Sequence, residues 1–343
     1  MAVTIREVAR ACGVHVSTVS RTFSAPHLVS PETRARVLAL ADELGYRPNR
    51  AARALTTGRT YNLGLIVADI SNPFFPPLIK AAQAHARERD YHVFVADTDE
   101  DPRVEEELIQ TFTKQVDGML LCSPRLSNRA IGRLRKDIPF VLINRRVKGL
   151  PAVLMDVGHG ARRAVEHLAG LGHRRLALLV GPEGSWTSQE ITEAAAASAC
   201  AHGAEVVVLG PNSPTEHGGR VAAPEVLRAG VTAVLAYNDL VAIGLVEGLA
   251  ELGIDVPSAV SVVGIDDIMP ARVNRPRLTT VSMPTIAAGR TAVDMLLQLV
   301  GSAETGGAAQ TTLETALVVR ESTTTVQPSP AQPPASRSSR EAS

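Results

Sequence analysis

The sequence predicts an all-α head followed by a larger α/β body with two lobes. Residues 4–46 contain three short helical patterns that are separated by turn residues. From residue 61 onward, short apolar runs alternate with helical stretches, and this alternation occurs in two successive sets. Alternating strands and helices are typical of doubly wound parallel sheets, and two sets indicate two similar lobes.

The head begins with a helix, a glycine turn and a second short helix. Thr4 and Glu7 form a capping-box pattern, which predicts that the first helix starts there. Gly13 allows a sharp turn, and residues 15–21 are mostly small and polar around an inward-facing Val19. This is the pattern of a helix-turn-helix, whose second helix lies in the major groove of duplex DNA.

A third helix closes the head. Ser30 is expected at its N-cap and Pro31 at its first position, and Gly45 ends it. We expect its buried stripe to consist of Val37, Leu38, Ala41 and Leu44.

Residues 48–57 form a short basic segment that contains one large apolar residue, Leu55. A helix of this length is marginal in water, so we expect the segment to be disordered in the free protein and to fold on DNA. Leu55 would then be a wedge in the minor groove. Taken alone, a basic stretch is more often a solvated helix face, and a helix-turn-helix pattern can occur by chance.

The charge is unevenly distributed. Lys plus Arg equal Asp plus Glu over the whole chain, but residues 1–60 contain nine arginines and four acidic residues, a net charge of +5. The remainder therefore carries −5. A basic head on an acidic body indicates nucleic acid as the partner of the head.

Cys12, Cys122 and Cys200 show no metal-ligand spacing, and we interpret them as buried free thiols in a reducing cytoplasm. No apolar run is long enough to span a membrane, and the N-terminal segment lacks the pattern of a signal peptide. We therefore expect a cytoplasmic protein without a metal or a cofactor, associated with the nucleoid when bound to DNA.

Eight apolar runs in the body are predicted to be strands, together with a helix at 285–300 and a last strand at 312–319. The runs are 63–68, 91–96, 116–122, 140–143, 176–180, 204–209, 233–237 and 260–265. Ligands bind at the carboxyl ends of strands in open parallel sheets. The side chains expected there are Phe74, Phe75, Ser123, Asn144, Trp186, Asn238 and Asp266.

These polar and aromatic groups suit a small polyhydroxylated or heterocyclic ligand. Asp239 and Asp267 follow Asn238 and Asp266 directly, and we prefer to interpret both as helix N-caps. Phe74 and Phe75 could also be ordinary packing at a helix start. Trp186 is expected in a loop, where an indole is less easily explained as core.

The motifs of the head continue into the body in a fixed order. The segments concerned are 5–21, 29–37, 45–55, 63–67, 71–75, 116–121, 172–182, 237–239, 261–267, 278–281 and 317–322. Over nearly the whole chain this order closely resembles that of the LacI/GalR family of bacterial transcriptional regulators. The resemblance implies a helix-turn-helix head and a two-lobed, periplasmic-binding-protein-like effector domain.

The resemblance also implies domain boundaries. They are 1–46 for the head, 47–60 for a hinge helix, 61–156 with 284–310 for lobe 1, and 157–282 with 312–326 for lobe 2. The late helix and strand return to lobes 1 and 2 respectively, so the chain crosses between the lobes three times. Residues 327–343 are rich in Pro, Ser, Ala and Arg and are expected to be disordered. They lack the leucine-heptad helix that joins two dimers in some family members.

The family match places base-reading residues at Val16, Ser17 and Arg21, with the hinge helix in the minor groove. The full set of DNA-contacting candidates is Thr4, His15, Val16, Ser17, Thr18, Ser20, Arg21, Asn49, Arg50, Arg53 and Leu55.

The chain departs from the family pattern in the expected effector cleft. Ile191 and Ala194 occupy positions that are usually Arg and Gly, and Asn144 stands where Asp is usual. Loosely aligned, Pro214 replaces a second aromatic residue. Either the cleft has lost effector binding, or the ligand has changed to a less anionic and more apolar one, stacked on Trp186 and held by Asp266.

Taken together, the sequence predicts a transcriptional repressor that binds a near-palindromic operator as a homodimer under the control of a sugar-like effector. An α/β enzyme is the first alternative, but no dinucleotide-binding glycine pattern, P-loop or nucleophile elbow is present. A sugar-binding protein of the transport type is the second, but the N-terminus carries a DNA-binding pattern instead.

Overall fold

The computed structural model describes residues 3–24, 26–47, 58–301 and 309–326. The chain divides into two compact units, Met1–Tyr61 and Asn62–Ser343. The predicted hinge helix and the predicted tail lie outside the described residues. No helix in the described part of the chain is long and apolar enough to cross a lipid bilayer.

The head contains α1 (Ile5–Cys12), α2 (Val16–Ser24), the 3-10 turn η1 (Pro26–Leu28) and α3 (Pro31–Glu43). Its buried core consists of Val8, Ala9, Cys12, Val19, Val37, Ala41 and Tyr46. The predicted stripe of α3 is partly wrong, because Leu38 and Leu44 are both exposed. Leu40 packs against the core in place of Leu38, since positions 37, 40 and 41 share one helix face.

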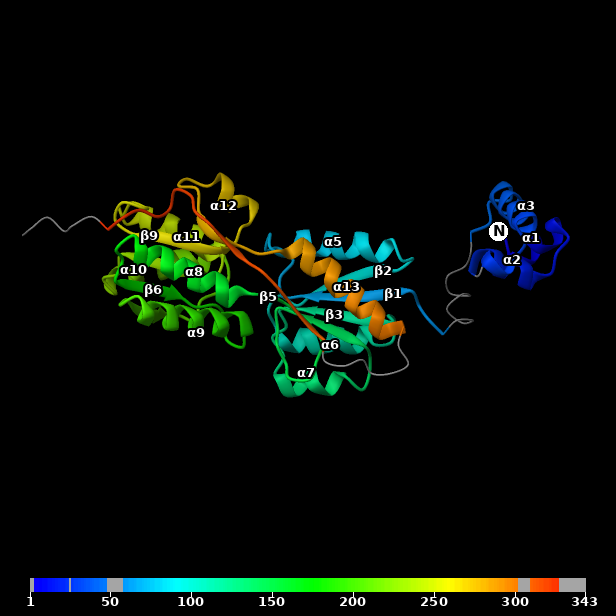
Figure 1. The fold of residues 1–343 in the computed structure, drawn as a ribbon, viewed down its shortest axis with the longest axis horizontal. Helices are drawn as coiled ribbons and strands as arrows, with labels where there is room; N and C mark the ends of the chain where they lie inside the picture. The colour runs from blue at the N-terminus through cyan, green and yellow to red at the C-terminus, as the bar shows by residue number, and fades with distance from the viewer. Residues whose placement is uncertain (1–2, 25, 48–57, 302–308, 327–343) are drawn as a thin grey trace, which may run out of the picture. The chain divides into compact units, whose positions relative to one another are not determined.

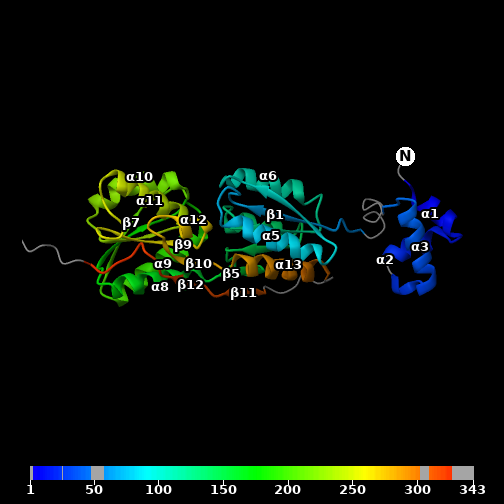
Figure 2. The same ribbon diagram turned by 90° about the horizontal axis from the view of Figure 1, so that it is seen from above.

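Lobe 1 is a six-stranded parallel sheet in the order β11-β5-β4-β3-β1-β2. Its strands are β1 (Asn62–Val67), β2 (His92–Asp97), β3 (Gly118–Cys122), β4 (Phe140–Ile143), β5 (Ala152–Met155) and β11 (Gln310–Leu313). Helices α5 (Phe75–Arg87) and α13 (Thr285–Gly301) cover one face, and α6 (Pro102–Phe112) and α7 (Asn128–Leu134) cover the other (Figures 1 and 2).

Lobe 2 has a second six-stranded sheet in the order β12-β10-β9-β8-β6-β7. Its strands are β6 (Arg175–Leu179), β7 (Glu205–Leu209), β8 (Ala233–Ala236), β9 (Ser261–Asp266), β10 (Thr279–Ser282) and β12 (Ala316–Val318). Its helices are α8 (Val157–Gly170), α9 (Trp186–Ala201), α10 (Glu216–Arg228), α11 (Asp239–Glu251) and α12 (Met269–Val273). Only β12 runs antiparallel to its neighbour among these described strands. The predicted fold class, an α-helical head with a two-lobed α/β domain, is confirmed.

The predicted strand at 312–319 is wrong, because that segment forms two strands in different sheets. β11 pairs with β5 of lobe 1, and β12 pairs with β10 of lobe 2. The chain thus passes between the lobes three times: after β5, after β10 and after β11. The red C-terminal segment in Figures 1 and 2 is the last of these passages.

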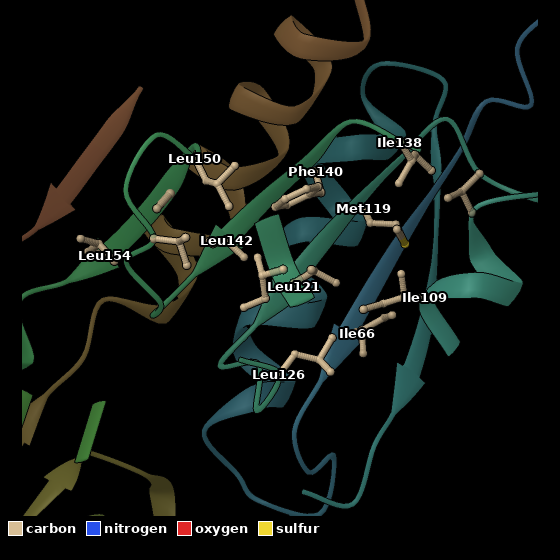
Figure 3. Close-up of a cluster of buried hydrophobic side chains, with 14 residues drawn as sticks. Ile66, Ile109, Met119, Leu121, Leu126, Ile138, Phe140, Leu142, Leu150 and Leu154 are labelled. Atoms are coloured by element: carbon tan, nitrogen blue, oxygen red, sulfur yellow. The ribbon is translucent and has the colours of Figure 1, made fainter. Parts of the chain in front are cut away.

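The core of lobe 1 shows why this sheet is rigid. β3 and β4 are buried along their whole length, as strands covered on both faces must be. Met119, Leu121 and Leu142 lie at the centre of a cluster that reaches α6 through Ile109 (Figure 3). The carboxyl ends of these strands are therefore held in fixed positions.

Candidate DNA-binding surface and interlobe cavity

The first helix of the head is fixed at its start by Thr4 and Glu7. The Glu7 carboxylate accepts hydrogen bonds from the Thr4 backbone N–H at 2.7 Å and from the Thr4 hydroxyl at 2.9 Å. These bonds lower the pKa of Glu7, the backbone bond contributing most. The predicted capping box is present, so Thr4 has a structural role beside any contact with DNA.

The second helix begins at a histidine that caps it. The Nδ1 atom of His15 accepts the Ser17 backbone N–H at 3.2 Å and lies 2.8 Å from the Ser17 hydroxyl. An acceptor at Nδ1 of a neutral ring places the proton on Nε2. Sequence reasoning gave His15 only as a DNA contact and did not recognise it as a cap.

Most of the predicted DNA-reading residues at the start of α2 lie outside the core of the head, but Val16 packs against it. His15, Ser20 and Arg21 are exposed, and Val16, Ser17 and Thr18 are half-buried. Thr22, by contrast, is buried and donates its hydroxyl to the Thr18 carbonyl at 2.9 Å. The predicted contacts Asn49, Arg50, Arg53 and Leu55 lie outside the described residues. The DNA contacts themselves stay predictions.

A cavity lies between lobes 1 and 2. The space between the two walls is about 460 Å³, counted with the solvent at its mouth. The lining residues are Asn72, Phe74, Phe75, Glu100, Ser123, Arg125, Asn144, Val157, Thr187, Ile191, Pro214, Tyr237, Asn238, Ile265, Asp266 and Met283.

Backbone strain is concentrated at this cavity. Four residues that line it have φ in the positive range that favours glycine: Glu100 at 62°, Ser123 at 52°, Asn144 at 54° and Asp266 at 125°. Such conformations cost free energy and persist where the surrounding structure imposes them, typically at functional sites. All four residues line the space between the lobes.

Six of the seven predicted effector residues line the cavity: Phe74, Phe75, Ser123, Asn144, Asn238 and Asp266. Their role in binding an effector stays a prediction. Ile191 and Pro214, which stand where the family resemblance implies Arg and an aromatic residue, also line it. Glu100, Arg125 and Tyr237 line it too, and sequence reasoning missed them.

The side-chain amides of two predicted effector residues already form hydrogen bonds within the protein. Asn238 caps α11, because its Oδ1 accepts the Val241 N–H at 2.8 Å, and its Nδ2 donates to the Pro214 carbonyl at 3.0 Å. The Oδ1 of Asn144 accepts the Met155 N–H at 3.1 Å. Since both amide oxygens are engaged, these residues offer the cavity mainly N–H donors.

The two aspartates that were interpreted as N-caps have other structural roles. Asp239 is buried and accepts the Thr280 hydroxyl at 2.5 Å and the Ile268 N–H at 3.0 Å. Asp267 forms ion pairs with Arg320 and, at 2.9 Å, with Arg272. The N-cap of α11 is Asn238 and that of α12 is Ile268. The N-cap interpretation was therefore wrong for both aspartates, and neither lines the cavity.

Asp266 presents a carboxyl group that favours its neutral form. Burial raises its pKa well above the usual value, and the neighbouring Asp239 raises it further. The pKa of Asp239 is itself raised to about 7, chiefly by burial. A protonated Asp266 can both donate and accept a hydrogen bond.

Trp186 differs from its prediction. It is the first residue of α9 rather than part of a loop, and it is not among the described residues that line the cavity. Its half-buried indole packs against the hydrophobic core of lobe 1, and the Arg146 guanidinium lies 5.8 Å from the ring centroid. Arg145 of lobe 1 also donates across the lobes, to the Gly184 carbonyl at 2.9 Å. Trp186 thus joins the lobes, and the prediction that it stacks on a ligand loses its geometric support.

Comparison with known proteins identifies the family. Residues 4–49 match the family described as bacterial regulatory proteins, lacI family, and residues 165–323 match the periplasmic binding protein-like domain. The chain is 35% identical over 312 residues to the HTH-type transcriptional regulator GalS of Salmonella typhimurium, covering 86% of this chain and 89% of that protein. The chain belongs to the LacI family.

Solved structures of LacI-family proteins share its fold. A lac repressor dimer bound to operator and the anti-inducer ONPF matches with a TM-score of 0.84 at 26% identity, covering 94% of this chain and all of that one. A complex of the transcriptional regulator CelR with cellobiose matches with a TM-score of 0.70 at 30% identity, covering 93% and 99%. The chain is accordingly a DNA-binding transcriptional regulator of the LacI family.

Proposed function

We propose that this regulator is a repressor that binds a near-palindromic operator as a homodimer, and that a small saccharide in the interlobe cavity controls this binding. The observation that carries the proposal is the pairing, in one chain, of a helix-turn-helix head with a strained, polar cavity between two lobes. A related lac repressor binds operator as a dimer, and CelR binds cellobiose. Such a protein acts on the nucleoid, in the bacterial cytoplasm.

The proposed mechanism is linkage between the two binding events. A ligand that contacts both walls of the cavity has different affinities for different separations of the lobes, and it therefore shifts the equilibrium between them. Because lobe 1 is joined directly to the segment that leads to the head, such a shift can alter how two heads are presented to two half-sites. We assign no catalytic role to the cavity.

The effector prediction is tested after an operator has been selected from a pool of random duplexes. Operator affinity and thermal stability of the full chain are then measured with and without D-ribose, cellobiose, D-glucose and D-galactose, at one fixed salt concentration because DNA binding depends on salt. The expected result is that at least one sugar raises the melting temperature and changes operator affinity. If operator binding is specific and no sugar changes either quantity, the saccharide proposal is wrong.

A further inference from the structure

Arg125 is the one cation among the described residues that line the interlobe cavity. It follows β3 by three residues and projects from lobe 1. Its side chain is only 5% exposed. Across the cavity, Ile191 of lobe 2 supplies no hydrogen-bond donor.

The guanidinium is held rigidly by its neighbours. Both Nε and Nη2 donate to the carboxylate of Glu100, the latter at 3.0 Å, and Nη1 donates to the Ser123 carbonyl at 2.7 Å. Burial acts to lower the pKa of Arg125, but Tyr237 of lobe 2 and Glu100 outweigh it and keep the pKa above its usual value. Arg125 therefore stays charged and reaches the facing lobe.

Two features of this arrangement matter for a ligand. A guanidinium has more N–H donors than Glu100, Ser123 and Tyr237 accept between them, so one hydrogen on the Nη atoms remains for a ligand. The positive charge is also cancelled by Glu100, which leaves directional donors without a net charge. Such a group favours the hydroxyl and ring oxygens of a ligand. A ligand carboxylate would instead compete with Glu100 for the fork, the paired N–H donors of the guanidinium.

We propose that Arg125 is an effector-contacting residue that hydrogen-bonds the oxygens of a neutral saccharide, and that the Glu100 pair sets the preference for a neutral ligand over an acidic one. This inference rests on the proposed function. It adds the residue that reads the ligand and the charge class of that ligand. Donors from lobe 1 then face the carboxyl group of Asp266 on lobe 2, so one saccharide contacts both lobes.

The test uses full-length protein and isothermal titration calorimetry with D-ribose, cellobiose, D-glucose and D-galactose, and with D-glucuronate and D-galacturonate as acidic probes. The main variant is the double substitution Arg125→Gln with Glu100→Gln, which removes the fork without leaving an unpaired buried charge. Arg125→Lys is the second variant, since it keeps the charge and the Glu100 pair but loses the fork. The matched control neutralises the exposed pair of Arg175 and Glu205, whose side chains are 46% and 61% exposed, by the double substitution Arg175→Gln with Glu205→Gln.

The expected result is binding of at least one neutral sugar, weakened about 10- to 100-fold in the double variant, as for hydrogen bonds to a charged group. Arg125→Lys should weaken it as well, and the control should not. If the double variant does not fold, Arg125→Lys alone decides.

Three results would overturn the inference, and they are distinguishable. Undiminished sugar affinity in a folded double variant, or in Arg125→Lys, would remove Arg125 from the ligand contacts while leaving sugar control intact. Tighter binding of glucuronate or galacturonate than of their neutral counterparts would overturn the charge class. Absence of any sugar effect on the wild-type chain would overturn the proposed effector, and this inference with it.

Discussion

Two carboxyl groups beside the cavity, the buried Asp239 and the half-buried Asp266, make the stability of the protein depend on pH. The pKa of Asp239 is raised from 3.8 to about 7, mainly by burial. The folded state therefore keeps protons that the unfolded chain has already released. Between these two values the folded state binds more protons, so the free energy of unfolding falls as the pH rises.

The variant Asp239→Asn should reduce this dependence. The amide cannot ionise and can still accept the Ile268 N–H, so the decline of the unfolding free energy between about pH 4 and pH 7 should be shallower than in the wild type. Urea titrations across this pH window measure the slope. Asp137→Asn, at an exposed site in the same unit, should leave it unchanged. A slope in Asp239→Asn equal to that of the wild type would contradict the prediction.

Arg21 provides a prediction for the head. It is exposed on α2, one helical turn beyond Ser17, where it can contact guanine or phosphate. We expect Arg21→Ala to lower specific operator binding by roughly 1–3 kcal/mol. Gel-shift titrations should compare operator with random duplex. If Arg21 contacts guanine, the variant should bind only the operator more weakly, and if it contacts phosphate, the variant should bind both duplexes more weakly. Unchanged affinity for both duplexes would exclude Arg21 from the interface.

Six of the residues that line the cavity could be predicted, several of them because a simple rule applies to them. Side chains directly after parallel strands, such as Ser123, Asn144 and Asn238, must meet at one edge of each sheet. Arg125 was not predicted, because it follows β3 by three residues and its ion pair with Glu100 directs it into the cavity. Trp186 was misplaced because the sequence does not show how closely the lobes approach each other.

Among the elements, strands with a strong apolar pattern could be predicted and the others could not. β10 was missed because its sequence, Thr-Thr-Val-Ser, is mostly polar although it is largely buried. β5 is an exception, because it was missed although it is as short, as buried and as apolar as β4, which was predicted. β11 and β12 were joined into one strand because two residues separate them and only pairing with different sheets distinguishes them.

Helices α10 and α11 show how glycine fixes the packing of an element. A Cβ atom added to Gly244 would lie 1.8 Å from the Glu216 carbonyl oxygen, and one added to Gly219 would lie 1.9 Å from the Val241 carbonyl oxygen. The two backbones therefore touch directly, and no side chain can yield to make room.

We expect Gly244→Ala to lower the free energy of unfolding by about 3 kcal/mol or more, because the helices must separate. Gly132→Ala is the matched control. Gly132 is exposed within α7 and has nothing within 4 Å of an added Cβ, so this change should stabilise the chain by roughly 0.5–1 kcal/mol. Chemical denaturation of both variants measures the two effects. Equal effects would mean that α10 and α11 are not packed backbone to backbone.

For the molecule as a whole, Trp186 reports on the contact between the lobes. It is the only tryptophan of the chain, and it packs on lobe 1 from lobe 2. Arg145→Gln removes the cross-lobe bond to Gly184, so the indole should become more exposed. Its emission should shift to longer wavelengths and be quenched more readily by iodide.

The control is Arg135→Gln, because Arg135 also donates to a backbone carbonyl, that of Gly149, but within lobe 1. Its emission spectrum should match that of the wild type. If Arg145→Gln keeps the wild-type emission while its melting temperature falls, Arg145 stabilises lobe 1 only.

Assembly gives the last prediction. One head contacts one half-site, so a near-palindromic operator requires two heads. We expect light scattering of the full chain at micromolar concentration to report a homodimer. A chain that stays monomeric in the presence of operator would contradict the proposed mode of binding.

The three passages between the lobes have a consequence for how the protein responds to a protease. The first and third are hydrogen-bonded to each other, since the Thr315 hydroxyl donates to the Asp156 carbonyl at 2.8 Å and the Asp156 N–H donates to the Leu313 carbonyl at 2.9 Å. Cleavage of any one passage leaves two intact passages between the lobes, and the two fragments stay packed together within the sheets they share. The nicked protein should therefore run as one particle on a sizing column, although a denaturing gel shows two fragments.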